Sequence, residues 1–141
     1  MPTEIQQRCE TIEECYEFTL SYAAQGHSSD EGSASGPQLR EHLTRAVEAL
    51  AGMEASCAAT LREQQLEPAA KYEAYFAILV RDAEAARTAI ELVLAQPAIS
   101  SQLIDNLNAS IHLRALLTDL FLIAEVLEGR QTRAASAAVA Q

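Results

Sequence analysis

Residues Gln102–Glu128, QLIDNLNASIHLRALLTDLFLIAEVLE, form the most hydrophobic segment of the chain and contain neither glycine nor proline. Such a segment predicts a helix, in which successive residues turn by ~100°. Its first half places the apolar side chains on one side. From Leu113 the apolar arc has turned to roughly the opposite side, where it is widened by Phe121, Leu122 and Val126.

A helix with two apolar faces needs either two sets of neighbours or a kink. We therefore predict that this helix packs inside its own subunit and also contacts a second copy of the chain. The predicted dimer-interface residues are Leu116, Leu120, Phe121, Ile123 and Leu127.

The composition favours helices over sheets. Of the 141 residues, 49% are hydrophobic but only 5% are aromatic, so that alanine and leucine make up most of the apolar content. The formal net charge of −10 argues against nucleic acid and anionic membranes as partners, because both are bound by basic surfaces. We expect instead a homodimer and a protein partner that carries a basic patch.

Capping signals and breaks divide the chain into four predicted helices. Thr3–Gln6 and Ser35–Gln38 each read as a capping box, and Gly26 and Gly129 are predicted helix terminators. The helices cover about residues 3–26, 36–65, 67–96 and 100–128, with a flexible loop over 27–35. Apolar residues alternate at steps of four and three in the first three helices, as in helices that pack side by side. These predicted seams include Ile5, Cys9, Ile12, Tyr16, Thr19 and Ala23 in the first helix and Tyr72, Phe76, Leu79, Ala83, Ala86, Ile90 and Val93 in the third. The predicted fold is an all-α, antiparallel up-down-up-down four-helix bundle over residues 1–129, dimeric, followed by an Ala-rich tail over 130–141.

The first predicted helix carries an acidic outer face made of Glu10, Glu13, Glu14 and Glu17. Such a face is either simply solvated or serves as a docking surface for a basic partner. The segment is too acidic for a signal peptide, and this indicates a cytoplasmic protein. The odd number of cysteines and the absence of CxxC predict free thiols, buried or half-buried, at Cys9, Cys15 and Cys57.

A polar stripe follows the last predicted helix, with Asp105, His112 and Asp119 seven residues apart and Asn108 one turn before His112. The stripe is either the solvated edge of a groove or part of the dimer seam, where acids and imidazoles could bind a metal or titrate with pH. No histidine follows an acid by three residues, which excludes a carboxylate di-iron centre. A haem held by His112 and Met53, or another small ligand in the bundle core, stays an alternative.

The nine residues Ser110–Thr118, SIHLRALLT, resemble the phospho-accepting helix of histidine kinases and phosphotransfer domains, which are also antiparallel bundles. The resemblance implies a phosphocarrier that uses His112. The chain departs from that pattern at Leu113, where an acid usually follows the histidine, and at Ala115, where glycine or threonine is usual.

Nucleophilic catalysis has no support, because neither a serine nor a cysteine lies in a recognisable elbow motif. We therefore predict a non-enzymatic interaction protein with no catalytic residues, no metal and no cofactor.

Overall fold

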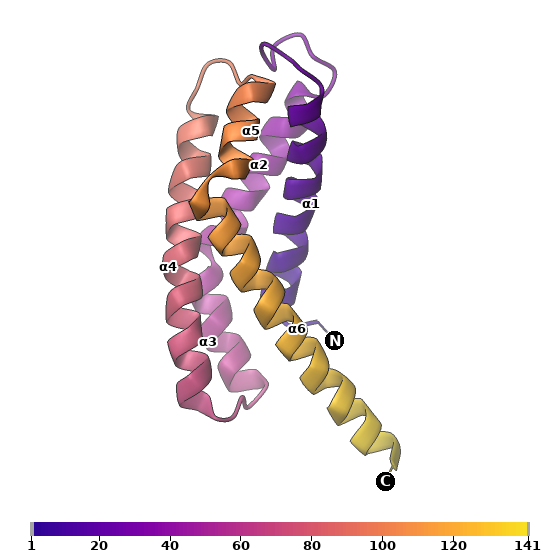
Figure 1. Ribbon diagram of the computed structural model, residues 1–141. Coiled ribbons are helices and arrows are strands. Elements are labelled where there is room, and N and C mark those ends of the chain that lie inside the picture. The colour runs from indigo at the N-terminus through magenta and orange to yellow at the C-terminus, as the bar shows by residue number, and fades with distance from the viewer. Residues whose placement is uncertain (1, 141) are drawn as a thin grey trace.

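The computed structural model describes residues 2–140, and all regular structure within that range is helical (Figure 1). This confirms the all-α prediction. The number of helices is six rather than the predicted four, because two of the expected helices are broken. The six helices are α1 (Glu4–Ala24), α2 (Gly36–Ala51), α3 (Met53–Glu63), α4 (Ala69–Leu94), α5 (Ser101–Ala109) and α6 (Ile111–Ala140).

The break between α2 and α3 lies at Gly52, where the guanidinium group of Arg8 from α1 packs. A Cβ atom at residue 52 would lie 2.5 Å from Nη2 of Arg8, closer than a real carbon approaches. Arg8 donates a hydrogen bond to the carbonyl of Ala49 at 3.0 Å, so that the last turn of α2 bonds to α1. Glycine at this position therefore provides room for a side chain of another helix.

The break between α5 and α6 lies at Ser110, in the middle of the most hydrophobic segment. Its backbone is extended (φ −64°, ψ 143°), and its hydroxyl accepts a hydrogen bond from the amide of Leu113 at 3.3 Å. After the break α6 runs obliquely across the other helices, and its C-terminal end extends beyond them (Figure 1). The two apolar faces read from the sequence thus belong to two helices of different direction.

The core is built from the predicted seams with one shift of register. All the predicted seam residues of α4 from Phe76 to Val93 are buried. In α1 the buried positions after Ile12 are Cys15, Thr19 and Tyr22, so that Cys15 and Tyr22 replace the expected Tyr16 and Ala23. The hydroxyl of Tyr22 explains its place, because it donates to the carbonyl of Ile99 at 2.7 Å.

Some of the predicted helix caps and terminators are present in the structure and others are not. Thr3 and Gln6 form the expected capping box. Ser35 precedes α2 but makes no capping hydrogen bond with its side chain, so the second capping box is wrong. Gly26 has φ +72° just after α1, as a terminator should, whereas Gly129 lies inside α6, which continues to Ala140.

The loop between α1 and α2 is anchored at Asp30, which is 7% exposed. The carboxylate of Asp30 accepts hydrogen bonds from Nε of Arg40 at 2.6 Å and from the amide of Ile99 at 2.7 Å. Arg40 also donates to the carbonyls of Leu94 and Gln96 at the end of α4. One acidic residue therefore joins the α1–α2 loop to the α4–α5 connection, although the composition of residues 27–35 predicted flexibility.

Candidate interaction face on α4 and α6

An exposed apolar surface lies along the line where α4 and α6 meet. On α6, Phe121 is 46% exposed, Leu122 55% and Val126 39%, and on α4 Ile78 is 42% exposed. Leu122 and Val126 line an almost wholly apolar groove of about 180 Å³ between the two helices, together with Lys71, Tyr72, Tyr75 and Ile123. Ile78 lies one turn from Tyr75 on the same side of α4, whereas Phe121 is turned by ~100° from Leu122 around α6 and lies outside the groove. We call this groove together with Ile78 the α4–α6 face.

The helical repeat explains how α4 contributes to this face. Lys71, Tyr75, Ile78 and Asp82 follow each other at steps of four, three and four, which aligns them along one side of a helix. The hydroxyl of Tyr75 donates to the backbone carbonyl of Asp119 at 2.8 Å, so this side of α4 lies against α6.

The predicted dimer-interface residues divide between the core and the exposed surface of α6. Leu116, Leu120, Ile123 and Leu127 are at most 3% exposed and pack inside the subunit. Of the five predicted residues, Phe121 is the one that reaches the surface. Leu122 and Val126 widened the apolar arc in the sequence, and that widening was the signal for the exposed face. The contribution of α4 had no such signal, because it depends on the direction α6 takes after Ser110.

Two carboxyl groups meet at one end of the face, Asp82 from α4 and Asp119 from α6. Burial is the main cause that raises the pKa of Asp119 to about 7, and the hydrogen bond and the charge of Asp82 raise it further. The Oδ2 atom of Asp119 is buried, and no donor reaches it among residues 2–140. Burial, followed by the charges of Asp119 and Asp82, also raises the pKa of Tyr75 to about 12. Asp119, Asp82 and Tyr75 therefore form one cluster, in which the raised pKa of Asp119 leaves its carboxyl partly protonated near pH 7.

The other members of the predicted polar stripe do not join Asp119. Asp105 and His112 are exposed, whereas Asn108 is buried and accepts a hydrogen bond from Thr19 at 3.1 Å. The break at Ser110 separates Asp105 and Asn108 on α5 from the two residues on α6. Within the described range no group of three or more histidine, cysteine or acidic residues could hold a metal ion.

The two candidate haem ligands, Met53 and His112, also differ in solvent exposure. Met53 is 1% exposed, in the core at the start of α3, and His112 lies on the surface in the first turn of α6. The helix bounds predicted from the sequence, 36–65 and 100–128, place these two residues near the middle of their helices. That prediction is wrong, because the breaks at Gly52 and Ser110 put each residue close to the start of a helix.

The acidic face of α1 lies largely in solvent. Glu10, Glu14 and Glu17 are exposed, and Glu13 is half-buried and accepts a hydrogen bond from the thiol of Cys9. Cys9, Cys15 and Cys57 are free and buried, as predicted. Burial is the main cause that raises the pKa of each thiol to about 12, so all three are poor nucleophiles at neutral pH.

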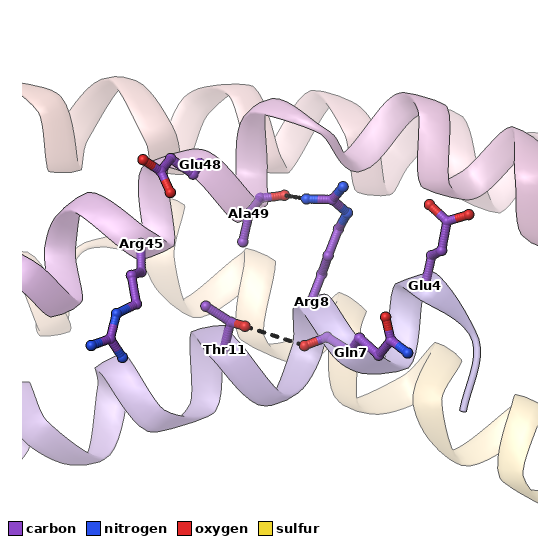
Figure 2. Close-up of a pocket in the computed structure, with 7 residues that line it drawn as sticks. All are labelled: Glu4, Gln7, Arg8, Thr11, Arg45, Glu48 and Ala49. Atoms are coloured by element: carbon purple, nitrogen blue, oxygen red, sulfur yellow. Dashed lines mark hydrogen bonds between the residues drawn. The ribbon is translucent and has the colours of Figure 1, made fainter. Parts of the chain in front are cut away.

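A second cleft, between α1 and α2, is polar. Its volume is about 390 Å³, and it is lined by Glu4, Gln7, Arg8, Thr11, Arg45, Glu48 and Ala49. Figure 2 shows Arg8 reaching across from α1 to the carbonyl of Ala49. Arg8 also donates to the hydroxyl of Ser56 at 2.5 Å, and Arg45 pairs with Glu41. Both arginines are bonded to groups of the same chain, and charges of opposite sign alternate along the cleft. The polar groups of this cleft therefore hold helices together and offer no strong binding site for an ion.

No protein family, curated protein or solved structure matches this chain. Among the described residues, no helix combines the length and the apolar content that a membrane span requires.

Proposed function

We propose that this protein is a non-enzymatic interaction module that self-associates as a homodimer through the α4–α6 face. The observation that carries the proposal is the exposure of Leu122 and Val126 in an apolar groove beside α4, with Ile78 exposed one turn from that groove. Contiguous exposed apolar side chains of this kind mark surfaces that bind other proteins. In the proposed dimer, each subunit is the equivalent of a four-helix bundle. The pair α2 and α3 takes the place of one helix and the pair α5 and α6 that of another, beside α1 and α4.

The distribution of charge along the face favours a second copy as the occupant. Lys71 lies at one end, Asp82 and Asp119 lie at the other, and apolar side chains lie between them. In a two-fold symmetric contact whose axis crosses the length of the face, each end of the surface meets the opposite end of the other copy. Such a pairing places unlike charges together and buries the apolar centre against itself, even though the subunits carry a net charge of −10 each.

Sedimentation equilibrium of matched variants tests the proposal. In Leu122→Glu a charge is placed in the centre of the face, and we expect dimer affinity to fall by at least about 100-fold, since burial of an unpaired charge costs several kcal/mol. In Leu92→Glu the same change is made at a residue of α4 that is 66% exposed and lies outside the face, so this control should dimerise like the wild type. Equal behaviour of the two variants would refute the proposed face.

Phosphotransfer through His112 is the second candidate function. Exposure of His112 in the first turn of α6 is the observation that favours it, because a phosphocarrier histidine must be reachable by a kinase. Acid-labile phosphate on the wild type, absent from His112→Gln after incubation with a histidine kinase, would support it. The acidic residues of α1 remain the proposed contact for a basic protein partner.

A further inference from the structure

We infer that Lys71 of each copy forms an ion pair with the Asp82–Asp119 carboxyl pair of the other copy. This inference rests on the proposed self-association through the α4–α6 face, and it assigns the polar contacts that determine how the two copies align.

The geometry of the face aligns Lys71 of one copy with the two carboxyl groups of the other. Lys71 and Asp82 are eleven residues apart on one side of α4, a separation of ~16 Å at ~1.5 Å per residue. Helix α6 runs antiparallel to α4, since Asp119 lies beside Tyr75 and Asp82 while Val126 lines the groove with Lys71. A two-fold axis near Leu122, half-way along the face, therefore brings Lys71 of one copy to the carboxyl pair of the other.

Each group lacks what the other supplies. Neither Asp82 nor Asp119 takes part in an ion pair within residues 2–140, and the side chain of Asp119 is hydrogen-bonded to another acid. Lys71 is exposed, and among the ion pairs of the described chain none includes its ammonium group. The more solvent-facing side of the carboxyl pair is open to an ammonium group from outside the subunit, because Asp82 and Asp119 are both only half-buried.

The charges around Asp119 determine the direction of the pH dependence. From α4 it faces Asp82 and Tyr75, and on α6 the cleft beside it contains Arg114 and Thr118. Ala109 is the residue of α5 in that cleft, and α1 contributes no lining residue to it. Burial and the neighbouring acid favour the protonated form of Asp119 in a single subunit, whereas an incoming ammonium group favours its ionised form. Association should therefore release protons, and the dimer should tighten as pH rises through neutrality.

The test is the dissociation constant at about pH 6 and about pH 8, because each released proton contributes up to about a tenfold change per pH unit. We expect the wild type to bind at least about tenfold more tightly at the higher pH, and this gain should shrink as salt is raised. In Lys71→Met the apolar stem is kept and the charge removed, so binding should weaken and lose its pH dependence. In Lys71→Arg both should be retained.

Arg114→Met is the matched control, because it removes the other basic side chain near Asp119. It should behave like the wild type. If Lys71→Met dimerises with the affinity and pH dependence of the wild type, or if Arg114→Met abolishes the pH dependence, the ion pair is refuted. In either case, the proposed function would still be supported if Leu122→Glu lost the dimer and the Leu92→Glu control kept it. A wild type that is monomeric at both pH values refutes both proposals.

Discussion

Replacing Gly52 by alanine should destabilise the protein, although alanine is the better helix former. The favourable term is small, since glycine costs at most about 1 kcal/mol against alanine inside a helix, and Gly52 lies at a break. The unfavourable term comes from Arg8, because the new Cβ would lie 2.5 Å from Nη2 and 2.7 Å from Cζ of its guanidinium group. That group must move, and its displacement breaks the hydrogen bonds to Ser56 at 2.5 Å and to Ala49 at 3.0 Å.

Hydrogen bonds from a charged group contribute about 1.5–3 kcal/mol each, and Arg8 is half-buried, so part of that energy is recovered from water. We therefore expect Gly52→Ala to lower the free energy of unfolding by about 1–3 kcal/mol. In an Arg8→Ala background the new methyl group meets no guanidinium. There the same change should be neutral or stabilising by up to about 1 kcal/mol.

Urea denaturation of the four proteins measures this cycle, with the midpoint compared at constant m value. Gly129→Ala is the control, because a Cβ there would meet only a guanidinium nitrogen of Arg133 at 3.4 Å, an ordinary contact. It should be neutral or slightly stabilising. If Gly52→Ala destabilises the wild type and the Arg8→Ala background equally, the role assigned to Arg8 is wrong.

Three further predictions concern titratable groups. Asp30→Ala should lower the free energy of unfolding by about 2–4 kcal/mol at neutral pH. Because the hydrogen bond from Arg40 is the main cause that lowers the pKa of Asp30, this stabilisation is present above about pH 4 and lost below it, so the difference from the wild type should shrink in acid. Asp119→Asn should have the opposite pH dependence, because the raised pKa of Asp119 makes the wild type lose stability as the pH rises from about 4 to 7. At concentrations where the protein is monomeric, the asparagine variant should therefore be more stable than the wild type above pH 7. The expected difference in the free energy of unfolding is about 1–2 kcal/mol after a discount for solvent screening. A neutral alkylating reagent at about pH 8 should modify native Cys9, Cys15 and Cys57 far more slowly than the urea-unfolded chain, and equal rates would contradict their burial.

The seams and several helix ends could be predicted from the sequence because they depend on local signals. Spacing alone identified the buried side of α4, and Thr3 with Gln6 forms the expected cap at the start of α1. The break at Gly52 could not be predicted, because a mid-helix glycine is compatible with a continuous helix until Arg8 of another element needs the space. Ser110 is similar, since its residue type permits a helix and only the change of apolar face suggested a kink.

The candidate site was predicted only in part, for a related reason. Leu122 and Val126 were recognised as widening the apolar arc, and Asp119 was named from its place in a polar stripe. Whether an apolar residue of α6 lies in the core or on the surface depends on the oblique course of that helix, which moves Leu120 inside and leaves Leu122 outside. The pairing of Asp119 with Asp82 joins two helices that are distant in sequence, and no pattern within either helix indicates it.

The central claim is self-association through the α4–α6 face, and the mass of the wild type in solution tests it most directly. Sedimentation equilibrium at about 50 µM, near pH 8 and at low salt, should give a mass approaching twice the 15.3 kDa of one chain, decreasing toward the single-chain mass on dilution. A mass of 15.3 kDa that does not change with concentration would contradict the account.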